Sequence, residues 1–263
     1  GLQNEWKDSR ELIRTDSNFG SAAIDFQTTN EQATQFFGNS PAQLFILPGF
    51  IASNAKGLTT TLGRGGSDYT AAIIAAAMNA SMLEIWTDVS GIMTADPRFV
   101  QNARVVAHIS YQEAMELSHF GAKVIYPPTM QPVLKRSIPV KVKNTFAPDH
   151  DGTLIDEKAN GQGNAIRGIS SINTIALLGL EGSGMVGVPG FSKRLFDALS
   201  RETINVIFIT QSSSEHSISV GINEDDVIKA KTVVDSEFAF EISVKKVDPL
   251  IIERGLSIVA LVG

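Results

Sequence analysis

The chain has 263 residues, of which 43% are hydrophobic and 19% charged, which fits one large or two ordinary folded domains. A formal net charge of -6 argues against a nucleic-acid partner, because no surplus of basic residues is present to neutralise phosphates. The absence of cysteine excludes disulfides, thiol catalysis and cysteine-ligated zinc. No apolar run approaches the ~20 residues of a membrane span, and no signal peptide is visible. We therefore expect a cytoplasmic protein with no membrane partner.

The first sixty residues offer few strong patterns. A brief helix is predicted over residues 30–37, and a short buried strand over residues 43–47, which the turn signal Pro48-Gly49 ends. The chain opens with Gly1 and without an obvious start to a fold. We therefore expect a piece of a longer protein.

A glycine-rich stretch, Gly63-Arg64-Gly65-Gly66-Ser67-Asp68, precedes an alanine- and isoleucine-rich run. A helix that begins at Ser67 or Asp68 would offer free N–H groups and a positive dipole end to an anion. Arg64 would add a forked cation that suits carboxylate or phosphate. The alternative is an ordinary loop in which Ser67 or Asp68 caps the helix. These residues alone leave both interpretations open.

Polar residues follow the next predicted strand, which covers residues 83–87. Strand, loop, helix and strand is the order of α/β proteins, in which ligands bind at the carboxyl ends of strands. Thr87 and Asp88 lie at such an end, and Arg98 follows an Asp-Pro turn signal. Each has a plain alternative, a strand-ending turn or a solvated arginine, but together they favour a phosphate site. Lys123, taken alone, is most simply a solvated lysine.

A capping box, Ser110-Tyr111-Gln112-Glu113, predicts a helix that Gly121 ends. A further helix is predicted from Pro127-Pro128, and a strand over residues 138–145. Residues 156–168 are polar and glycine-rich and predict a linker.

Beyond this linker the pattern predicts a ferredoxin-like βαββαβ domain. Its expected elements are a strand over 174–180, a helix from Pro189, strands over 204–209 and 217–222, a helix over 225–234 and a strand over 238–244. Residues 256–262 are a further apolar strand that is similar to residues 174–179. We expect them to begin a second copy of this domain.

Six stretches closely resemble the aspartate kinases, in the order and near the spacing of that family, and the resemblance covers nearly the whole chain. They are Gly63-Arg64-Gly65-Gly66-Ser67-Asp68, Ile85-Trp86-Thr87-Asp88-Val89, Asp96-Pro97-Arg98, Ile109-Ser110-Tyr111-Gln112-Glu113-Ala114, Phe120-Gly121-Ala122-Lys123-Val124 and Val142-Lys143-Asn144-Thr145. The second domain resembles the ACT amino-acid-sensing domains of the same family. Residues 209–215 look most like the threonine-inhibited branch, in which the kinase is often fused to homoserine dehydrogenase.

The resemblance implies an α/β fold with an amino-acid-kinase-like αβα domain over residues 1–160. A ferredoxin-like ACT domain over residues 161–263 would follow. The Lys-Phe-Gly-Gly segment with which the family begins is not in this sequence, so we expect a C-terminal part of the kinase domain that is inactive or nearly inactive alone. Two positions depart from the family: Met93 replaces a frequent aromatic near adenine, and Tyr126 replaces a frequent histidine before proline.

By this resemblance the full enzyme transfers the γ-phosphoryl group of MgATP to the side-chain carboxylate of L-aspartate. Such transfer requires mainly positioning and charge neutralisation. Arg64 and Ser67 are then expected to bind aspartate, with Arg64 as a bidentate clamp, and Asp68 to act at the reacting centre by orienting the lysine of the absent segment. Thr87, Asp88, Arg98 and Lys123 would bind ATP. The four histidines show no metal-ligand spacing, so Mg²⁺ would arrive with ATP and not at a resident metal site.

The ACT resemblance also implies regulation and assembly. Asn205, Gln211 and the serine-rich turn after them would meet threonine or lysine as effector, while the plain alternative for both residues is a polar turn that satisfies its own backbone. ACT domains pair side by side, so a homodimer or larger homo-oligomer is expected. Two other functions stay open: a non-catalytic amino-acid-binding regulatory protein with a degenerate kinase half, and a related kinase that acts on a different acid or on UMP.

Overall fold

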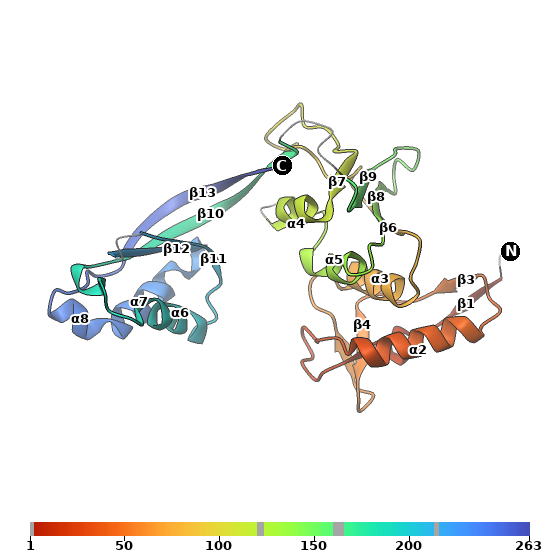
Figure 1. The fold of residues 1–263 in the computed structure, drawn as a ribbon, viewed down its shortest axis with the longest axis horizontal. Coiled ribbons are helices and arrows are strands. Elements are labelled where there is room, and N and C mark those ends of the chain that lie inside the picture. The colour runs from red at the N-terminus through yellow and green to blue at the C-terminus, as the bar shows by residue number, and fades with distance from the viewer. Residues whose placement is uncertain (1–2, 120–123, 160–165, 213–215) are drawn as a thin grey trace. The chain divides into compact units, whose positions relative to one another are not determined.

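A computed structural model describes residues 3–119, 124–159, 166–212 and 216–263. The chain forms two compact units (Figure 1). The first unit comprises Gly1–Ser170 together with Ala260–Gly263, and the second comprises Ser171–Val259. The predicted division into residues 1–160 and 161–263 stays a prediction. Among the described residues, no helix has the length and apolar character that a membrane crossing requires.

The N-terminal half of the first unit contains two small sheets and two helices. Its elements are β1 (Asn4–Trp6), α1 (Ser9–Leu12), β2 (Arg14–Thr15), α2 (Phe26–Asn39), β3 (Leu44–Ile46), β4 (Ile51–Asn54) and β5 (Thr59–Thr61). Strand β1 pairs with β3 in parallel, and a second sheet has the order β2-β4-β5. The helix predicted over residues 30–37 is confirmed within the longer α2. The strand predicted over residues 43–47 is also present. The prediction that this strand is buried was wrong, because Leu44 and Ile46 are 41% and 49% exposed.

The remainder of the first unit is a four-stranded sheet with three helices. Its elements are α3 (Gly66–Ala77), β6 (Leu83–Thr87), β7 (His108–Ser110), α4 (Tyr111–His119), α5 (Pro127–Leu134), β8 (Val140–Asn144) and β9 (Thr153–Asp156). The strand order is β6-β8-β9-β7, in which β6 runs parallel to β8 while β8 runs antiparallel to β9. Strand β9, which precedes the predicted polar linker, was not predicted from the sequence.

Helix α3 joins the two halves of the first unit because its apolar residues enter two different cores. Ala72, Ala75 and Ala76 belong to the core that β6, β8, α4 and α5 build. Ile73, which is 0% exposed, belongs to the core of Leu12 and its neighbours in the N-terminal half. Small side chains allow close packing on one side of the helix while a branched side chain fills the other side. The start of α3 is therefore held from two directions.

The capping box predicted for α4 is confirmed. The Ser110 backbone N–H donates to Glu113 Oε2 at 2.8 Å, and the Glu113 N–H donates to Ser110 Oγ at 3.2 Å. These reciprocal bonds satisfy two donors that a helix start otherwise leaves open. The predicted end of this helix at Gly121 lies outside the described residues.

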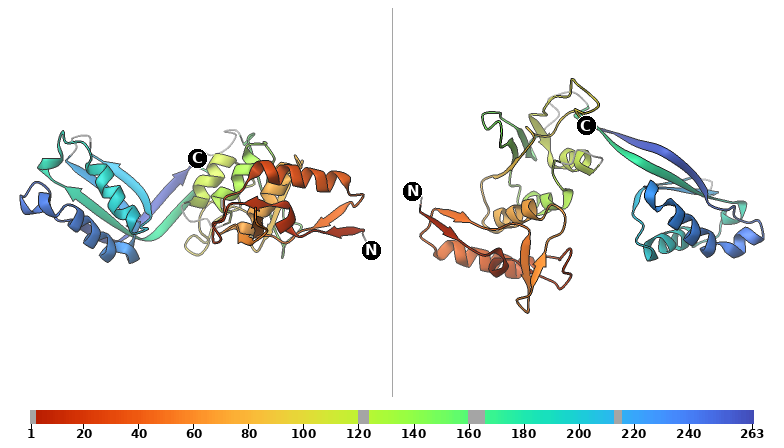
Figure 2. Two further views of the ribbon diagram at one scale, coloured as in Figure 1. Left: turned by 90° about the horizontal axis from the view of Figure 1, so that it is seen from below. Right: turned by 180° about the vertical axis from the view of Figure 1, so that it is seen from behind.

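The second unit is a four-stranded sheet covered by helices on one face (Figures 1 and 2). Its elements are β10 (Gly168–Glu181), the 3₁₀ turn η1 (Ser183–Met185), α6 (Phe191–Arg201), β11 (Val206–Gln211), β12 (Ser217–Asn223), the 3₁₀ turn η2 (Glu224–Asp226), α7 (Val227–Glu237), α8 (Ala239–Ser243) and β13 (Ile251–Val262). The strand order is β11-β12-β10-β13. Alternate residues of β10 and β12, such as Leu178 and Val220, are buried against Leu195 of α6 and Val234 of α7. This arrangement is the predicted βαββαβ plan.

One predicted element of this unit was wrong. Residues 238–244 were predicted as the fourth strand, but they form the end of α7 and the short helix α8. Phe238 is fully buried and stacks on Phe191 with ring centroids 5.6 Å apart. Glu237 and Glu241, about one helical turn apart, both bind Arg194 of α6. In a strand the same two residues would lie about 13 Å apart, too far to share one guanidinium. The fourth strand is instead β13, which contains residues 256–262; that these residues also begin a second copy of the domain stays a prediction.

Candidate functional site

The loop before α3 is built from glycines that no other residue would replace without strain. Gly63 and Gly65 have φ values of 71° and 67°, in the left-handed region. Gly65 is the N-cap of α3 and supplies no side chain to it, so the alternative that Ser67 or Asp68 caps the helix is wrong. A Cβ atom at Gly66 would lie 2.7 Å from the ring of Phe50. The helix start thus presents its first N–H groups without a capping side chain.

A second loop, Pro48-Gly49-Phe50, packs directly against this helix start. A Cβ atom at Gly49 would lie 2.8 Å from Cα of Ser67. Phe50 has a φ of 76°, and its N–H donates to Thr70 Oγ1 at 3.0 Å. Its side chain is 43% exposed beside the loop. Sequence reasoning did not include Phe50; the turn signal Pro48-Gly49 before it was the only available hint.

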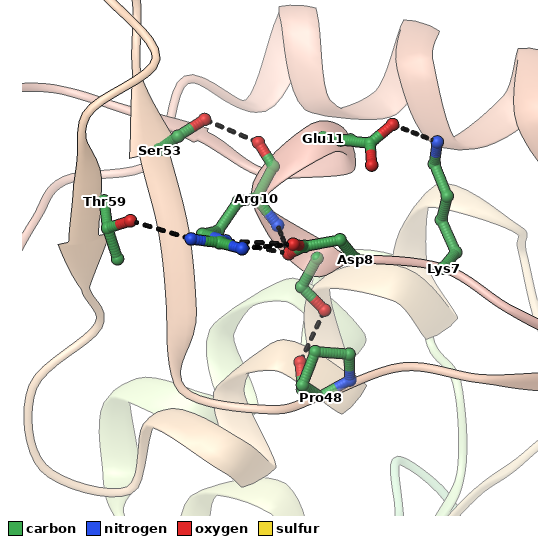
Figure 3. Close-up of polar contacts among 8 residues, drawn as sticks. Lys7, Asp8, Arg10, Glu11, Pro48, Ser53 and Thr59 are labelled. Atoms are coloured by element: carbon green, nitrogen blue, oxygen red, sulfur yellow. Dashed lines mark hydrogen bonds and ion pairs between the residues drawn. The ribbon is translucent and has the colours of Figure 1, made fainter.

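Helix α1 anchors the Pro48 end of this second loop (Figure 3). Ser9, which is fully buried, donates its Oγ–H to the Pro48 carbonyl oxygen at 2.5 Å. Arg10 forms an ion pair with Asp8 at 2.5 Å and donates to Thr59 Oγ1 at 3.2 Å, which ties α1 to β5. The hydrogen bonds from Arg10 hold the pKa of the Asp8 carboxyl below its usual range. The loop beside α3 is therefore supported by a polar cluster outside the site.

Arg64 and Asp68 are the charged groups at the start of α3. Arg64 is exposed, and among the described residues it forms no ion pair; its guanidinium carbon lies 5.9 Å from the ring centroid of Tyr126. Burial raises the pKa of the Asp68 carboxyl above its usual value, and no described cation pairs with it. Ser67 is exposed between them. The arrangement leaves a free guanidinium for an anion and a partly desolvated carboxylate for a cation.

The predicted nucleotide residues Thr87 and Asp88 lie at the carboxyl end of β6. Thr87 Oγ1 donates to Asp88 Oδ1 at 3.1 Å, and the Thr87 carbonyl accepts from the Thr145 N–H at 2.8 Å. Thr87 pairs in register with Asn144, the last residue of the parallel strand β8. Asn144 Nδ2 in turn donates to Ser90 Oγ at 3.0 Å. The loops that follow two parallel strands thus meet at one edge of the sheet, where α/β proteins bind ligands.

The structure describes only one of the two predicted phosphate-binding cations. Arg98 is 77% exposed and pairs with Asp96 at 2.6 Å, so it must exchange this partner to bind a phosphate. Lys123 lies outside the described residues. Among the described hydrogen bonds and ion pairs, none joins the Arg64–Asp68 group to Thr87, Asp88 or Arg98. The described part of the chain also contains no cluster of three residues suited to hold a metal ion.

The two predicted effector residues lie at opposite ends of β11. Gln211, at its end, lines a hollow of about 310 Å³ together with the glycine-containing loop before α6 and Phe191. Asn205, which is exposed, precedes the strand and does not line this hollow. The serine-rich turn is described only in part, because residues 213–215 lie outside the described range.

Comparison with known proteins shows which families the chain matches. Residues 1–144 match the amino acid kinase family, and residues 178–238 match an ACT domain. The bifunctional aspartokinase/homoserine dehydrogenase of Haemophilus influenzae is 45% identical over 221 residues, which cover 84% of this chain and 27% of that protein. The lysine-sensitive aspartokinase 3 of Escherichia coli is 38% identical over 267 residues, which cover 100% of this chain and 58% of that protein.

Solved structures show the same likeness. The structure of E. coli aspartokinase III in complex with aspartate and ADP has a TM-score of 0.80 and 37% identity, and the match covers 99% of this chain and 57% of that chain. The aspartate kinase of Clostridium acetobutylicum has a TM-score of 0.83 and 29% identity, with 98% and 57% covered. Fold and site define an amino-acid kinase domain followed by an ACT domain. The chain belongs to the aspartokinase family, and it spans between about a quarter and three fifths of the length of these relatives.

Proposed function

We propose that this chain is the aspartate-binding and regulatory part of an aspartate kinase, which transfers the γ-phosphoryl group of ATP to the β-carboxylate of L-aspartate. The observation that carries this proposal is the Arg64 guanidinium, which has no ion pair among the described residues, beside the start of α3, where no side chain caps the helix. A guanidinium fork and helix N–H groups together suit a carboxylate ligand. The complex of E. coli aspartokinase III with aspartate and ADP supports the choice of substrates.

We assign the residues of the site to two ligands, aspartate and ATP. Arg64 and Ser67 bind aspartate, because they lie at the helix start with their polar groups exposed. Asp68 orients the ammonium group of a lysine at the reacting centre, a role that suits a carboxylate without a described partner. Phosphoryl transfer requires positioning and charge neutralisation more than covalent chemistry, and these are the contributions that such groups make.

ATP binds at the second group of residues. Thr87 and Asp88 contact the nucleotide at the carboxyl end of β6, while Arg98 and Lys123 neutralise its phosphates. Arg98 exchanges its ion pair with Asp96 for a phosphate, which is a small cost because an exposed pair contributes about 0–1 kcal/mol. Mg²⁺ enters with ATP as part of the substrate.

The ACT unit binds an amino-acid effector and inhibits the kinase. Gln211 lines the hollow before α6 and contacts the effector, and Asn205 contributes from the other end of β11 or from a paired domain. Threonine is the effector we favour, because residues 209–215 resemble the threonine-inhibited branch; lysine, which E. coli aspartokinase III binds in its T-state structure, is the other candidate. We further propose a cytoplasmic homo-oligomer that pairs through its ACT domains, in the synthesis of lysine and threonine.

A kinetic assay on the full-length enzyme that contains this chain tests the proposal. Aspartyl phosphate, trapped with hydroxylamine, is expected to form only with both ATP and aspartate. Arg64→Ala is expected to raise the KM for aspartate by at least about a hundredfold, the equivalent of roughly 3 kcal/mol for a charged hydrogen-bonded pair. The KM for ATP should change little. Turnover of another acid or of UMP in place of aspartate would refute the assignment.

The effector assignment has its own test. Titration calorimetry of the chain with threonine and with lysine is expected to give heat with one of them, and Gln211→Ala is expected to abolish it. Heat of the same size with Gln211→Ala would remove this residue from the effector site. A chain that binds an amino acid while the full-length enzyme forms no aspartyl phosphate would instead be a non-catalytic regulator.

A further inference from the structure

Tyr126 contacts the guanidinium that the proposed function assigns to aspartate, although the two residues are far apart in the sequence. The Arg64 guanidinium carbon lies 5.9 Å from the centroid of the Tyr126 ring, within the range in which the π face attracts a cation. Tyr126 is 37% exposed and Arg64 is exposed too, so solvent reaches both residues. None of the sequence motifs assigned a role to this contact.

The backbone of Tyr126 is fixed by the first residues of α5. Pro127 holds Tyr126 in an extended conformation, with φ −85° and ψ 119°, because a residue before proline is excluded from the helical region. The Tyr126 carbonyl accepts from both the N–H and the Oγ–H of Thr129, at 2.9 Å and 2.6 Å. Thr129 is itself buried at the start of α5. The backbone of Tyr126 is therefore held in place at the start of α5.

The glycine-rich loop packs against Tyr126 at Gly65. A Cβ atom at Gly65 would lie 2.7 Å from Cβ of Tyr126 and 3.2 Å from its ring. Gly65 has a left-handed φ of 67°, so the loop turns at the point where it touches the tyrosine. Arg64 immediately precedes this contact. Its side chain therefore leaves the loop directly beside the ring.

A ring face and a carboxylate do not compete for the same part of an arginine. The guanidinium stacks through its plane, whereas it binds a carboxylate through the N–H groups at its edge. We propose that Tyr126 is a positioning residue for aspartate: its ring holds the Arg64 guanidinium in one orientation before the substrate arrives. This inference rests on the proposed function. Preorganisation of this kind lowers the entropy that binding must remove from a long side chain.

Kinetics of the full-length enzyme test the inference with paired variants. Tyr126→Leu removes the ring but keeps the Cβ atom that contacts Gly65, and it is expected to raise the KM for aspartate about two- to fivefold, the equivalent of roughly 0.5–1 kcal/mol. Tyr126→Phe keeps the ring and is expected to match the wild type. The kcat and the KM for ATP should be unchanged in both. Phe26→Leu, at an aromatic residue that is 39% exposed in the same unit, is the control.

The side-chain Nε–H resonance of Arg64 supplies a readout that does not depend on activity. It is expected to carry a ring-current shift that Tyr126→Leu removes and Tyr126→Phe retains, with Arg64→Lys used for its assignment. An unchanged resonance in Tyr126→Leu, or an unchanged KM for aspartate in that variant of an active enzyme, would overturn the inference. A wild-type enzyme that does not phosphorylate aspartate would refute the proposed function, while the resonance would still report whether the ring holds Arg64.

Discussion

Thr70 links the two loops of the site, and its hydroxyl gives the most specific stability prediction. It is 4% exposed, accepts from the Phe50 N–H at 3.0 Å and donates to the Gly66 carbonyl at 2.9 Å. Thr70→Val keeps the shape of the side chain and removes both hydrogen bonds. The Phe50 N–H then retains only a longer bond to the Gly66 carbonyl, at 3.3 Å. We expect a loss of about 1–2 kcal/mol in the free energy of unfolding.

Urea unfolding followed by tryptophan fluorescence measures this loss. Trp6 and Trp86, the two tryptophans of the chain, both lie in the first unit, so their signal reports that unit alone. Thr70→Ser keeps the hydroxyl and is the matched control for the hydrogen bonds. In the full-length enzyme, Thr70→Val is expected to raise the KM for aspartate by up to about tenfold, because the loosened Phe50 loop packs against Ser67.

Two results would refute this reasoning. A stability of Thr70→Val within about 0.3 kcal/mol of the wild type would mean that the hydroxyl does not support the loop. An equal rise of the KM for aspartate in Thr70→Ser would mean that the lost hydrogen bonds are not the cause.

Two further predictions concern a turn and an ion pair. Gly152→Ala is expected to destabilise the first unit by at least about 2 kcal/mol more than Gly57→Ala does. Both glycines have φ 76°, but only at Gly152 would a Cβ atom meet a neighbour, because it would lie 2.0 Å from the Val142 carbonyl oxygen. Similar urea midpoints for the two variants would contradict this prediction. Hydrogen bonds from Arg194 lower the pKa of the Glu241 carboxyl from its usual 4.5. The ion pair therefore stabilises the folded ACT unit above about pH 4.5, and this contribution to stability is lost as the pH falls through the lowered pKa. The melting temperature of Arg194→Met, measured by circular dichroism, should therefore lie below that of the wild type at pH 7 and approach it near pH 3; a constant difference would contradict the assignment.

The sequence predicted those parts of the site that depend on neighbouring residues. Two examples are the capping box of α4 and the strand over residues 83–87, which each follow from a short pattern with a local physical cause. For the same reason the βαββαβ order of the ACT unit was predictable. Local patterns of this kind are the most dependable ones in a single sequence.

Contacts between distant segments were not predictable in this way. The roles of Phe50 and Tyr126 depend on Thr70 and Arg64, which lie on other elements. The apolar residues 238–244 alternate well enough for a strand, but Phe238 is buried in a helical turn because Phe191 and Arg194 stack on it. Tertiary packing determines these contacts and the helical conformation of residues 238–244. A single sequence does not show which distant residues pack together.

By the proposed assignment, the start of α3 binds aspartate independently of the nucleotide residues at the end of β6. Titration calorimetry of the full-length enzyme with aspartate tests it most directly, with wild type, Arg64→Ala and Thr87→Ala compared under one condition. We expect binding by the wild type and by Thr87→Ala. Binding by Arg64→Ala should be at least about a hundredfold weaker, because that variant loses a charged hydrogen-bonded pair with the substrate. Equal affinity of Arg64→Ala and the wild type, with both proteins folded, would contradict it.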